Sequence, residues 1–197
     1  MGTNHMGRQS IRFPQPPVVR GFASVAGKKE REGPLGDQFT ATVQDTTFGE
    51  KSWERAERRM QQMTLELALE KAGLTDADLD AAFAGDLLNQ CIGSSFSLRN
   101  RGVPTLGLYG ACSTMAESLL LAAMSVSGGY ARTALAMTSS HFASSERQYR
   151  FPLGYGGQRT PTSQWTVTGA GAVLLGGGER GIRITAATIG SIVDRGI

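Results

Sequence analysis

The chain has 197 residues, of which 40% are hydrophobic and 19% charged, so it is long enough to form one domain with a substantial buried core. No apolar run approaches the roughly 18 residues that a membrane-spanning helix needs, and we therefore expect no transmembrane segment. The net charge is +3, and the 20 basic residues are interspersed with 17 acidic ones, which argues against the clustered basic face of a nucleic-acid-binding protein.

The first part of the chain is predicted to contain an extended arm, one strand and a loop. Residues 1–6 have the composition of a cloning remnant, so we expect the folded domain to cover residues 7–197. Three prolines argue against a helix in the first 17 residues. A strand is expected at 18–25, and the polar, glycine-containing segment 27–47 is expected to form a hairpin or a loop.

A long amphipathic helix is expected next. Ser52 is a favourable N-cap residue, and Gly73 is a favourable residue for the C-terminal end. Four apolar side chains between them recur at helical spacing: Ala56, Met60, Met63 and Leu67. This spacing predicts one apolar face that packs in the core.

Strands and helices alternate through the middle of the chain. The expected elements are, in order, a capped turn or short helix at 75–80, a buried strand at 81–85, a helix at 90–99, a strand at 103–109, an apolar helix at 114–127 and a strand at 131–139. A long loop is expected at 142–163. Two further strands, at 164–175 and 182–193, are joined by a glycine turn and are expected to pair as an antiparallel hairpin.

This order of elements predicts an α/β fold. We expect a mostly parallel five-stranded sheet with helices on both faces and an antiparallel edge strand. The chain ends without a terminating element, so we expect it to be part of a longer protein.

Three polar residues follow strands at their carboxyl ends: Asp86, Cys112 and His141. Parallel strands bring these ends to one edge of the sheet, and ligands of open α/β sheets bind at that edge. We therefore expect the three side chains to converge on one site.

Cys112 is the most informative of these residues. It lies in the sequence Gly110-Ala111-Cys112-Ser113, between a strand and a helix rich in small residues. A cysteine at a helix N-terminus is close to the positive end of the helix dipole, which favours the thiolate that covalent acyl transfer requires. The alternative is a buried, inert cysteine. The combined pattern favours a site-forming cysteine, and we predict that Cys112 is buried and faces the edge of the sheet. Cys91 lacks this context and is interpreted as structural.

Other candidate residues have two possible roles. His141 could donate a hydrogen bond to a ligand carboxylate or could cap a backbone carbonyl. Asp86 could contact the ligand, but an N-cap for the segment after it is favoured. Arg150 and Arg159 flank an aromatic loop, and an arginine fork matches a carboxylate, although most loop arginines are only solvated.

The sequence predicts neither a metal site nor a cofactor. Two cysteines are too few for a disulfide framework and lie outside metal-ligand spacing. The two histidines are His5, in the expected cloning remnant, and His141. A reducing, intracellular compartment fits this cysteine usage.

The elbow at 110–113 and the order of elements resemble the N-terminal half of the thiolase superfamily, which includes thiolases and β-ketoacyl synthases. The resemblance implies a thiolase-like half-domain whose site is completed by a second half of the same chain. In enzymes of this superfamily, the cysteine that matches Cys112 is the acylated nucleophile, and its histidine or asparagine partners come from the second half. A condensing enzyme that uses Cys112 as its nucleophile is therefore one candidate function.

Three segments resemble more closely the stage V sporulation protein AD family of spore-forming Firmicutes. They are 107–117 (GLYGACSTMAE), 138–142 (TSSHF) and 150–169 (RFPLGYGGQRTPTSQWTVTG). The third segment is the longest and the most specific. The resemblance extends from residue 7 to the end of the chain.

This second resemblance implies a binding protein rather than an enzyme. The implied ligand is dipicolinic acid (pyridine-2,6-dicarboxylate), free or as its calcium chelate, which is taken up into the developing spore. The implied partners are membrane proteins encoded alongside it, and the implied location is intracellular and peripheral to the spore inner membrane. The residues that we expect at the ligand site are Cys112, His141, Asp86, Ser113, Arg150 and Arg159.

Overall fold

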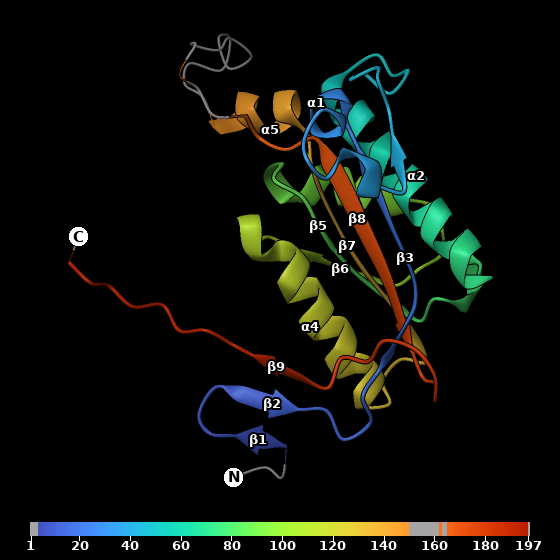
Figure 1. The fold of residues 1–197 in the computed structure, drawn as a ribbon, viewed down its shortest axis with the longest axis vertical. Helices are drawn as coiled ribbons and strands as arrows, with labels where there is room; N and C mark the ends of the chain where they lie inside the picture. Colours follow the sequence, from blue (N-terminus) through green and yellow to red (C-terminus); the bar gives the residue numbers. More distant parts are fainter. Residues whose placement is uncertain (1–3, 150–161, 163–164, 197) are drawn as a thin grey trace.

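The computed structural model describes residues 4–149, 162 and 165–196, and its centre is a mixed sheet of six strands (Figure 1). The strands lie in the order β4-β3-β8-β7-β5-β6. Their bounds are Val18–Ala26 (β3), Ala41–Thr42 (β4), Ala81–Gly85 (β5), Thr105–Leu108 (β6), Thr133–Ser140 (β7) and Gly169–Gly176 (β8). Neighbouring strands are parallel except at β8, which is antiparallel to both β3 and β7.

Helices cover both faces of this sheet. The long helix α2 (Trp53–Ala72) lies on one face and α4 (Thr114–Ser127) on the other (Figure 1). Side chains along β5 alternate between the two: Ala82 and Ala84 belong to the core cluster under α2, and Phe83 to the cluster under α4. Burial on both faces explains why β5 and β8 consist of apolar residues and glycine alone. The shorter helices are α1 (Lys28–Arg31), α3 (Ile92–Leu98) and α5 (Phe142–Tyr149).

The predicted bounds of α2 are confirmed. The hydroxyl of Ser52 accepts a hydrogen bond from the backbone N–H of Arg55 at 3.3 Å, and Gly73 ends the helix in the left-handed conformation with φ of 64°. The predicted apolar residues all pack in or against the core clusters: Ala56, Met60, Met63 and Leu67.

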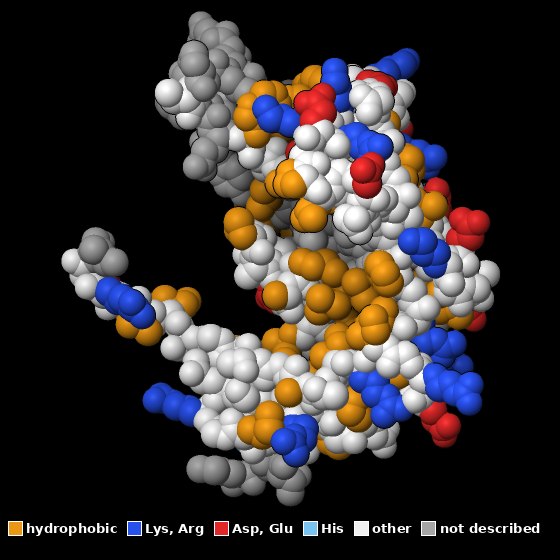
Figure 2. All heavy atoms as spheres, viewed as in Figure 1, with side chains coloured by type: hydrophobic (Ala, Val, Ile, Leu, Met, Phe, Trp, Pro, Cys, Tyr) orange, Lys and Arg blue, Asp and Glu red, His pale blue; other side chains and the backbone are white. Residues whose placement is uncertain are grey.

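Helix α4 has the predicted bounds and is apolar on most of its surface. Ala122, Ala123 and Val126 are buried against the sheet, whereas Met124 is 42% exposed. Figure 2 shows hydrophobic side chains gathered across the middle of the face in view. The sheet therefore covers only part of this helix.

The antiparallel strand differs from the expectation in both position and partner. We expected it at the edge of a five-stranded sheet, paired with 182–193, but β8 lies inside a six-stranded sheet, between β3 and β7. Its alternate residues contribute to both core clusters, so both of its faces and both of its edges are buried. The glycines after β8 therefore do not form a hairpin.

The segment after those glycines joins a second, smaller sheet. Here β9 (Ala186–Thr188) pairs with β2 (Ser10–Arg12), which pairs with β1 (His5–Met6), all antiparallel. This sheet lies at the C-terminal end of α4, and the chain beyond β9 extends away from the main body (Figure 1). His5 and Met6, which we had excluded from the fold, thus form a short strand.

Two segments contain helices that we did not expect, one of them predicted as a loop and the other as a hairpin or a loop. The expected loop at 142–163 begins with α5, whose first turn is closed by a hydrogen bond from the N–H of Ser145 to the carbonyl of His141 at 3.1 Å. The segment 27–47 contains α1 and β4, and β4 adds a parallel edge strand beside β3.

Candidate functional site

Cys112 lies on the predicted elbow between β6 and α4. The turn Ala111–Ser113 is a single turn of 3₁₀-helix that leads directly into α4. Ala111 has φ of 48°, a left-handed conformation that is strained for a residue with a side chain. This turn places Cys112 just before the N-terminal end of α4.

Hydrogen bonds from neighbouring side chains hold this elbow in place. The buried Thr114 donates through Oγ1 to the carbonyl of Ala111 at 2.8 Å and accepts from the N–H of Gly110 at 3.1 Å. The hydroxyl of Ser113 donates to the carbonyl of Gly110 at 2.7 Å. Thr114 thus positions Cys112. Thr114 was not among the predicted site residues, although a threonine within the first turn of a helix is a signal that could have indicated it.

A close approach between strands also fixes the elbow. A Cβ atom at Gly85, the last residue of β5, would lie 2.1 Å from the carbonyl oxygen of Leu108 and 2.5 Å from Cγ2 of Thr114. Only glycine allows the end of β5 to lie this close to the elbow.

Cys112 is exposed, so the prediction that it is buried is wrong. Ala111, which precedes it in the elbow, is also exposed. Ser113 is exposed as well. Cys91, in contrast, is buried and donates through its thiol to the carbonyl of Leu108 at 3.2 Å, and burial raises the pKa of that thiol. This contact fits its interpretation as structural.

A hollow of about 550 Å³ opens beside Cys112, within the size range typical of small-molecule sites. We call it the Cys112 hollow. Its lining comes from the ends of β3 and β7, the start of β8 and the elbow: Val25, Ala26, Phe39, Leu87, Ala111, Cys112, Met115, Thr138, Ser139, Ser140, Thr166, Val167, Gly169, Ala170 and Gly171. The described lining contains no charged side chain and is mainly apolar. It suits a small, flat ligand better than a strongly hydrated one.

Asp86 follows β5 as predicted, but it does not line the Cys112 hollow. Its buried carboxylate accepts hydrogen bonds from the N–H of Leu88 at 2.9 Å and from the N–H and hydroxyl of Ser94, both at 2.7 Å. Ser94 lies in the first turn of α3. Asp86 therefore binds the first turn of α3 rather than a ligand, but it is not the N-cap residue that we favoured, because Cys91 occupies that position.

His141 follows β7 as predicted, but its side chain points away from the Cys112 hollow. The imidazole is fully buried; Nδ1 accepts from the N–H of Ala143 at 3.2 Å, so Nε2 carries the proton and donates to the carbonyl of Thr46 at 2.8 Å. Burial lowers the pKa of His141, opposed by the hydrogen bond to Thr46. Both ring nitrogens are occupied, so His141 has the carbonyl-capping role rather than the ligand-binding one.

The expected convergence is thus correct for the strands and wrong for two of the side chains. The carboxyl ends of β5, β6 and β7 do lie together, because β5 is parallel to both of the others. Only Cys112 of the three predicted residues faces the hollow. Arg150 and Arg159 lie outside the described residues.

A buried polar network lies behind the hollow and was not predicted. Its centre is Glu57 of α2, which is fully buried and accepts hydrogen bonds from Ser139 at 2.7 Å and from Ser144 at 2.6 Å. Ser139 also lines the hollow and accepts from Gln61 at 2.6 Å. Burial raises the pKa of Glu57 from 4.5 to about 7, the bonds from Ser144 and Ser139 oppose this, and the negative charge of Asp86 adds to it. Polar residues spaced three and four apart beside the apolar stripe are the signal that could have revealed this network.

Within the described residues, no group of three or more His, Cys, Asp or Glu side chains is arranged to hold a metal ion. None of the described helices combines the length and the apolar content needed to cross a membrane.

The sequence matches one protein family along nearly its whole length. Residues 7–197 match the family described as Stage V sporulation protein AD. The chain is 44% identical over 191 residues to the Stage V sporulation protein AD of Bacillus subtilis (strain 168), in an alignment that covers 97% of this chain and 56% of that protein.

Solved structures with a similar fold include two synthases. The priming β-ketosynthase from the R1128 polyketide biosynthetic pathway matches with a TM-score of 0.55 at 16% identity, over 91% of this chain and 54% of that one. The 3-oxoacyl-[acyl-carrier-protein] synthase III from Aquifex aeolicus VF5 matches with a TM-score of 0.54 at 17% identity, over 83% of this chain and 55% of that one. At these identities the likeness shows the fold alone, and it confirms the predicted thiolase-like α/β fold. The chain spans about half the length of the proteins it matches.

Proposed function

The chain belongs to the stage V sporulation protein AD family, and from this premise we propose that its Cys112 hollow binds dipicolinic acid without turning it over. The observation that carries the proposal is the hollow itself, a cavity of about 550 Å³ that reaches the elbow and is lined by small and apolar side chains. A pyridine ring is flat and apolar on its faces, and such walls suit it.

The chemistry of the elbow supports an anionic ligand. The elbow lies at the N-terminal end of α4, which is the positive end of the helix dipole and favours a carboxylate. The thiol of Cys112 would then be a polarisable wall of the site. Because the described lining has no cation, we propose that Arg150 and Arg159, together with groups from the rest of the longer protein, neutralise the carboxylates.

The proposed partners follow from the same family membership. We propose that membrane proteins encoded with this protein hold it at the spore inner membrane and that the second half of the longer chain completes the ligand site. Co-purification of the full-length protein with membrane proteins from sporulating cells tests this placement, and recovery from the soluble fraction alone would argue against it.

A variant of Gly171 tests the site directly. Gly171 lines the Cys112 hollow, and a Cβ atom there would meet nothing within 4 Å, so strand β8 can accept a side chain that fills the hollow. In a calorimetric titration of the full-length protein with dipicolinate, we expect Gly171→Phe to weaken binding by at least about tenfold. Gly177→Phe is the matched control, because its Cβ also meets nothing and it lies outside the hollow. Unchanged binding in Gly171→Phe would contradict the proposed site.

The second candidate function is a condensing enzyme, and the exposed Cys112 on a strained elbow is the observation that favours it. In that reaction the thiol of Cys112 loses its proton and its sulfur attacks the carbonyl of an acyl-thioester. A new thioester forms, the bond to the carrier sulfur breaks, and the carrier thiolate takes up a proton in place of the one that Cys112 lost. We expect no stable adduct when the full-length protein is incubated with acyl-CoA and its intact mass is measured. A stoichiometric acyl adduct that a malonyl-thioester then removes would favour the enzyme.

A further inference from the structure

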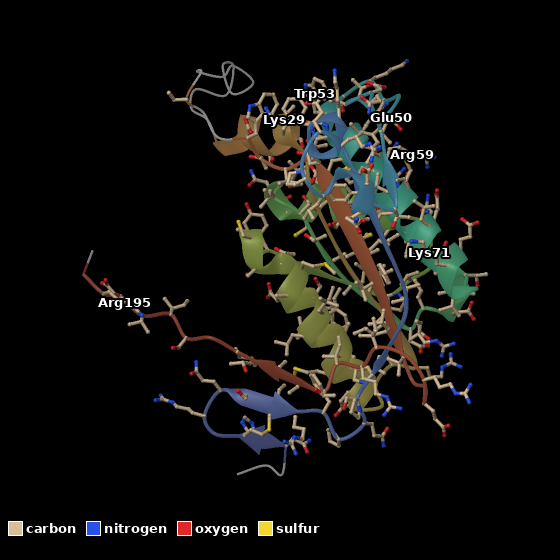
Figure 3. The ribbon with its side chains drawn as sticks, in the orientation of Figure 1. Lys29, Glu50, Trp53, Arg59, Lys71 and Arg195 are labelled. Atoms are coloured by element: carbon tan, nitrogen blue, oxygen red, sulfur yellow. The ribbon has the colours of Figure 1, made fainter. Side chains whose placement is uncertain are left out.

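A second hollow, which we call the arginine hollow, lies between the start of α2 and the outer face of α3. Its volume is about 330 Å³, which is large enough for a small organic molecule. It is lined by Ser52, Glu54, Arg55 and Arg58 on one side and by Ile92, Phe96 and Arg99 on the other. It shares no lining residue with the Cys112 hollow. Glu50 and Trp53, which mark the start of α2, are labelled in Figure 3.

The lining of the arginine hollow carries an excess of positive charge. Three guanidinium groups, from Arg55, Arg58 and Arg99, face one carboxylate, that of Glu54. Arg58 forms an ion pair with Glu50, with 3.1 Å between Nη2 and Oε1. Among the described residues, neither Arg55 nor Arg99 forms an ion pair, so their two guanidinium groups are available to bind a ligand.

One of these arginines has hydrogen-bonding capacity that the described structure does not use. The Nε atom of Arg58 is buried and has no hydrogen-bond partner among the described residues. An enclosed N–H group without an acceptor is unfavourable, and an oxyanion placed against the guanidinium would satisfy it.

The rest of the lining is apolar and exposed. Phe96 is 47% exposed and Ile92 is 37% exposed, although both lie on a helix that packs against the core through its other face. The guanidinium of Arg99 lies over the ring of Phe96, with 5.3 Å between Cζ and the ring centroid. The arginine hollow therefore combines planar cations with an apolar wall.

We infer that the arginine hollow is a binding site for a small organic oxyanion, a phosphate or carboxylate that carries an apolar or aromatic group. The oxyanion lies among Arg55, Arg58 and Arg99, whose planar guanidinium groups can each donate two parallel hydrogen bonds to a pair of its oxygen atoms. The apolar group packs against Phe96 and Ile92. The site is independent of the proposed dipicolinate site and stands if that proposal fails.

The test uses phenyl phosphate as the probe, with the full-length protein and isothermal titration calorimetry. We expect saturable binding that weakens as the salt concentration rises. Inorganic phosphate, which lacks the ring, and benzyl alcohol, which lacks the charge, should each bind more weakly. Equal affinity for phenyl phosphate and benzyl alcohol would overturn the inference, because the arginines would then contribute nothing.

Variants locate the binding site. Arg55→Gln combined with Arg99→Gln should weaken phenyl phosphate binding by at least about tenfold, since hydrogen bonds to charged groups are each worth that much or more. Both residues are exposed, and glutamine keeps the helical preference and part of the aliphatic stem, so the fold should persist. Arg59→Gln is the matched control: Arg59 lies on the same helix, pairs with Glu66 at 3.7 Å and does not line the hollow (Figure 3).

Two further outcomes decide the matter. Gly171→Phe, which fills the Cys112 hollow, should leave phenyl phosphate binding within about twofold of the unmodified protein. If Gly171→Phe abolishes this binding while the double arginine variant retains it, the probe binds beside Cys112 and the inference is overturned. An equal loss in Arg59→Gln and in the double variant would also overturn it, because general surface charge would then explain the binding.

Discussion

Replacement of Glu57 by glutamine tests the electrostatics of the buried network behind the Cys112 hollow. Glu57 is fully buried, and its described hydrogen-bond partners are the neutral hydroxyls of Ser139 and Ser144. An amide at this position keeps the shape of the side chain. It can accept from Ser139 through its oxygen and donate to Ser144, whose hydroxyl can donate in turn to the carbonyl of His141, 3.3 Å away.

The expected effect depends on pH, and its sign follows from the direction of the pKa shift. Burial raises the pKa of Glu57 from 4.5 to about 7 in the folded protein, so folding disfavours the charged form. The native protein carries no such penalty below about pH 4.5, acquires it between about pH 4.5 and 7, and carries all of it above. At about 1.4 kcal/mol per pKa unit, the penalty above pH 7 is of the order of 3 kcal/mol. Glu57→Gln removes it and should be more stable than the native protein at pH 8.

Thermal unfolding followed by circular dichroism at pH 5 and pH 8 measures this difference. We expect Glu57→Gln to unfold at a higher temperature at pH 8, by about 2–4 °C for each kcal/mol, and the two proteins to differ little at pH 5. Glu70→Gln is the control, because Glu70 is an exposed residue of the same helix and should have little effect. A difference between native and Glu57→Gln proteins that is the same at both pH values, or a less stable variant at pH 8, would refute the reasoning.

Three further predictions concern the elbow and its surroundings. A thiol reagent added to the native protein should modify Cys112 and spare Cys91, because Cys112 is exposed whereas Cys91 is buried with a raised thiol pKa; mass spectrometry of the peptides checks this, and equal labelling would contradict the structure. Gly85→Ala should destabilise the protein by several kcal/mol and change the rate of Cys112 modification, because the added methyl group would lie 2.1 Å from the carbonyl oxygen of Leu108; urea unfolding measures the loss, and a change below about 0.5 kcal/mol would count against this packing. Since burial lowers the pKa of His141, the native protein should lose stability as the pH falls below about 6.5. The difference in unfolding free energy between the native protein and His141→Gln should therefore be smaller at pH 5 than at pH 8. An unchanged difference would mean that His141 is not a buried neutral imidazole.

The sequence by itself determined those elements whose signals are local. The N-cap at Ser52 and the glycine at Gly73 set the bounds of α2, because both act through hydrogen bonds and backbone conformation within one helical turn. The same reasoning located α4 and the elbow that carries Cys112, since a strand that ends in glycine and is followed by an apolar helix leaves few alternatives. The motif segments also led to the family, which the match over residues 7–197 then confirmed.

Only the tertiary structure decided which residues meet across long distances in the chain. The strand β8 is an apolar run whose own pattern fits an edge or an interior position equally well. Its place between β3 and β7 depends on partner strands that are distant in the sequence. His141 and Asp86 were correctly placed at strand ends, but their side chains turn to the carbonyl of Thr46 and to the N–H and hydroxyl of Ser94, so their polar atoms are paired inside the fold. Glu57 is buried with hydroxyls of β7 and α5 as its partners. The polar spacing within α2 can indicate a buried polar face, but it cannot identify these two partner elements. Local rules fix the elements and their ends. The direction in which the functional side chains point depends on the whole chain, because buried polar groups must find hydrogen-bond partners wherever the fold provides them.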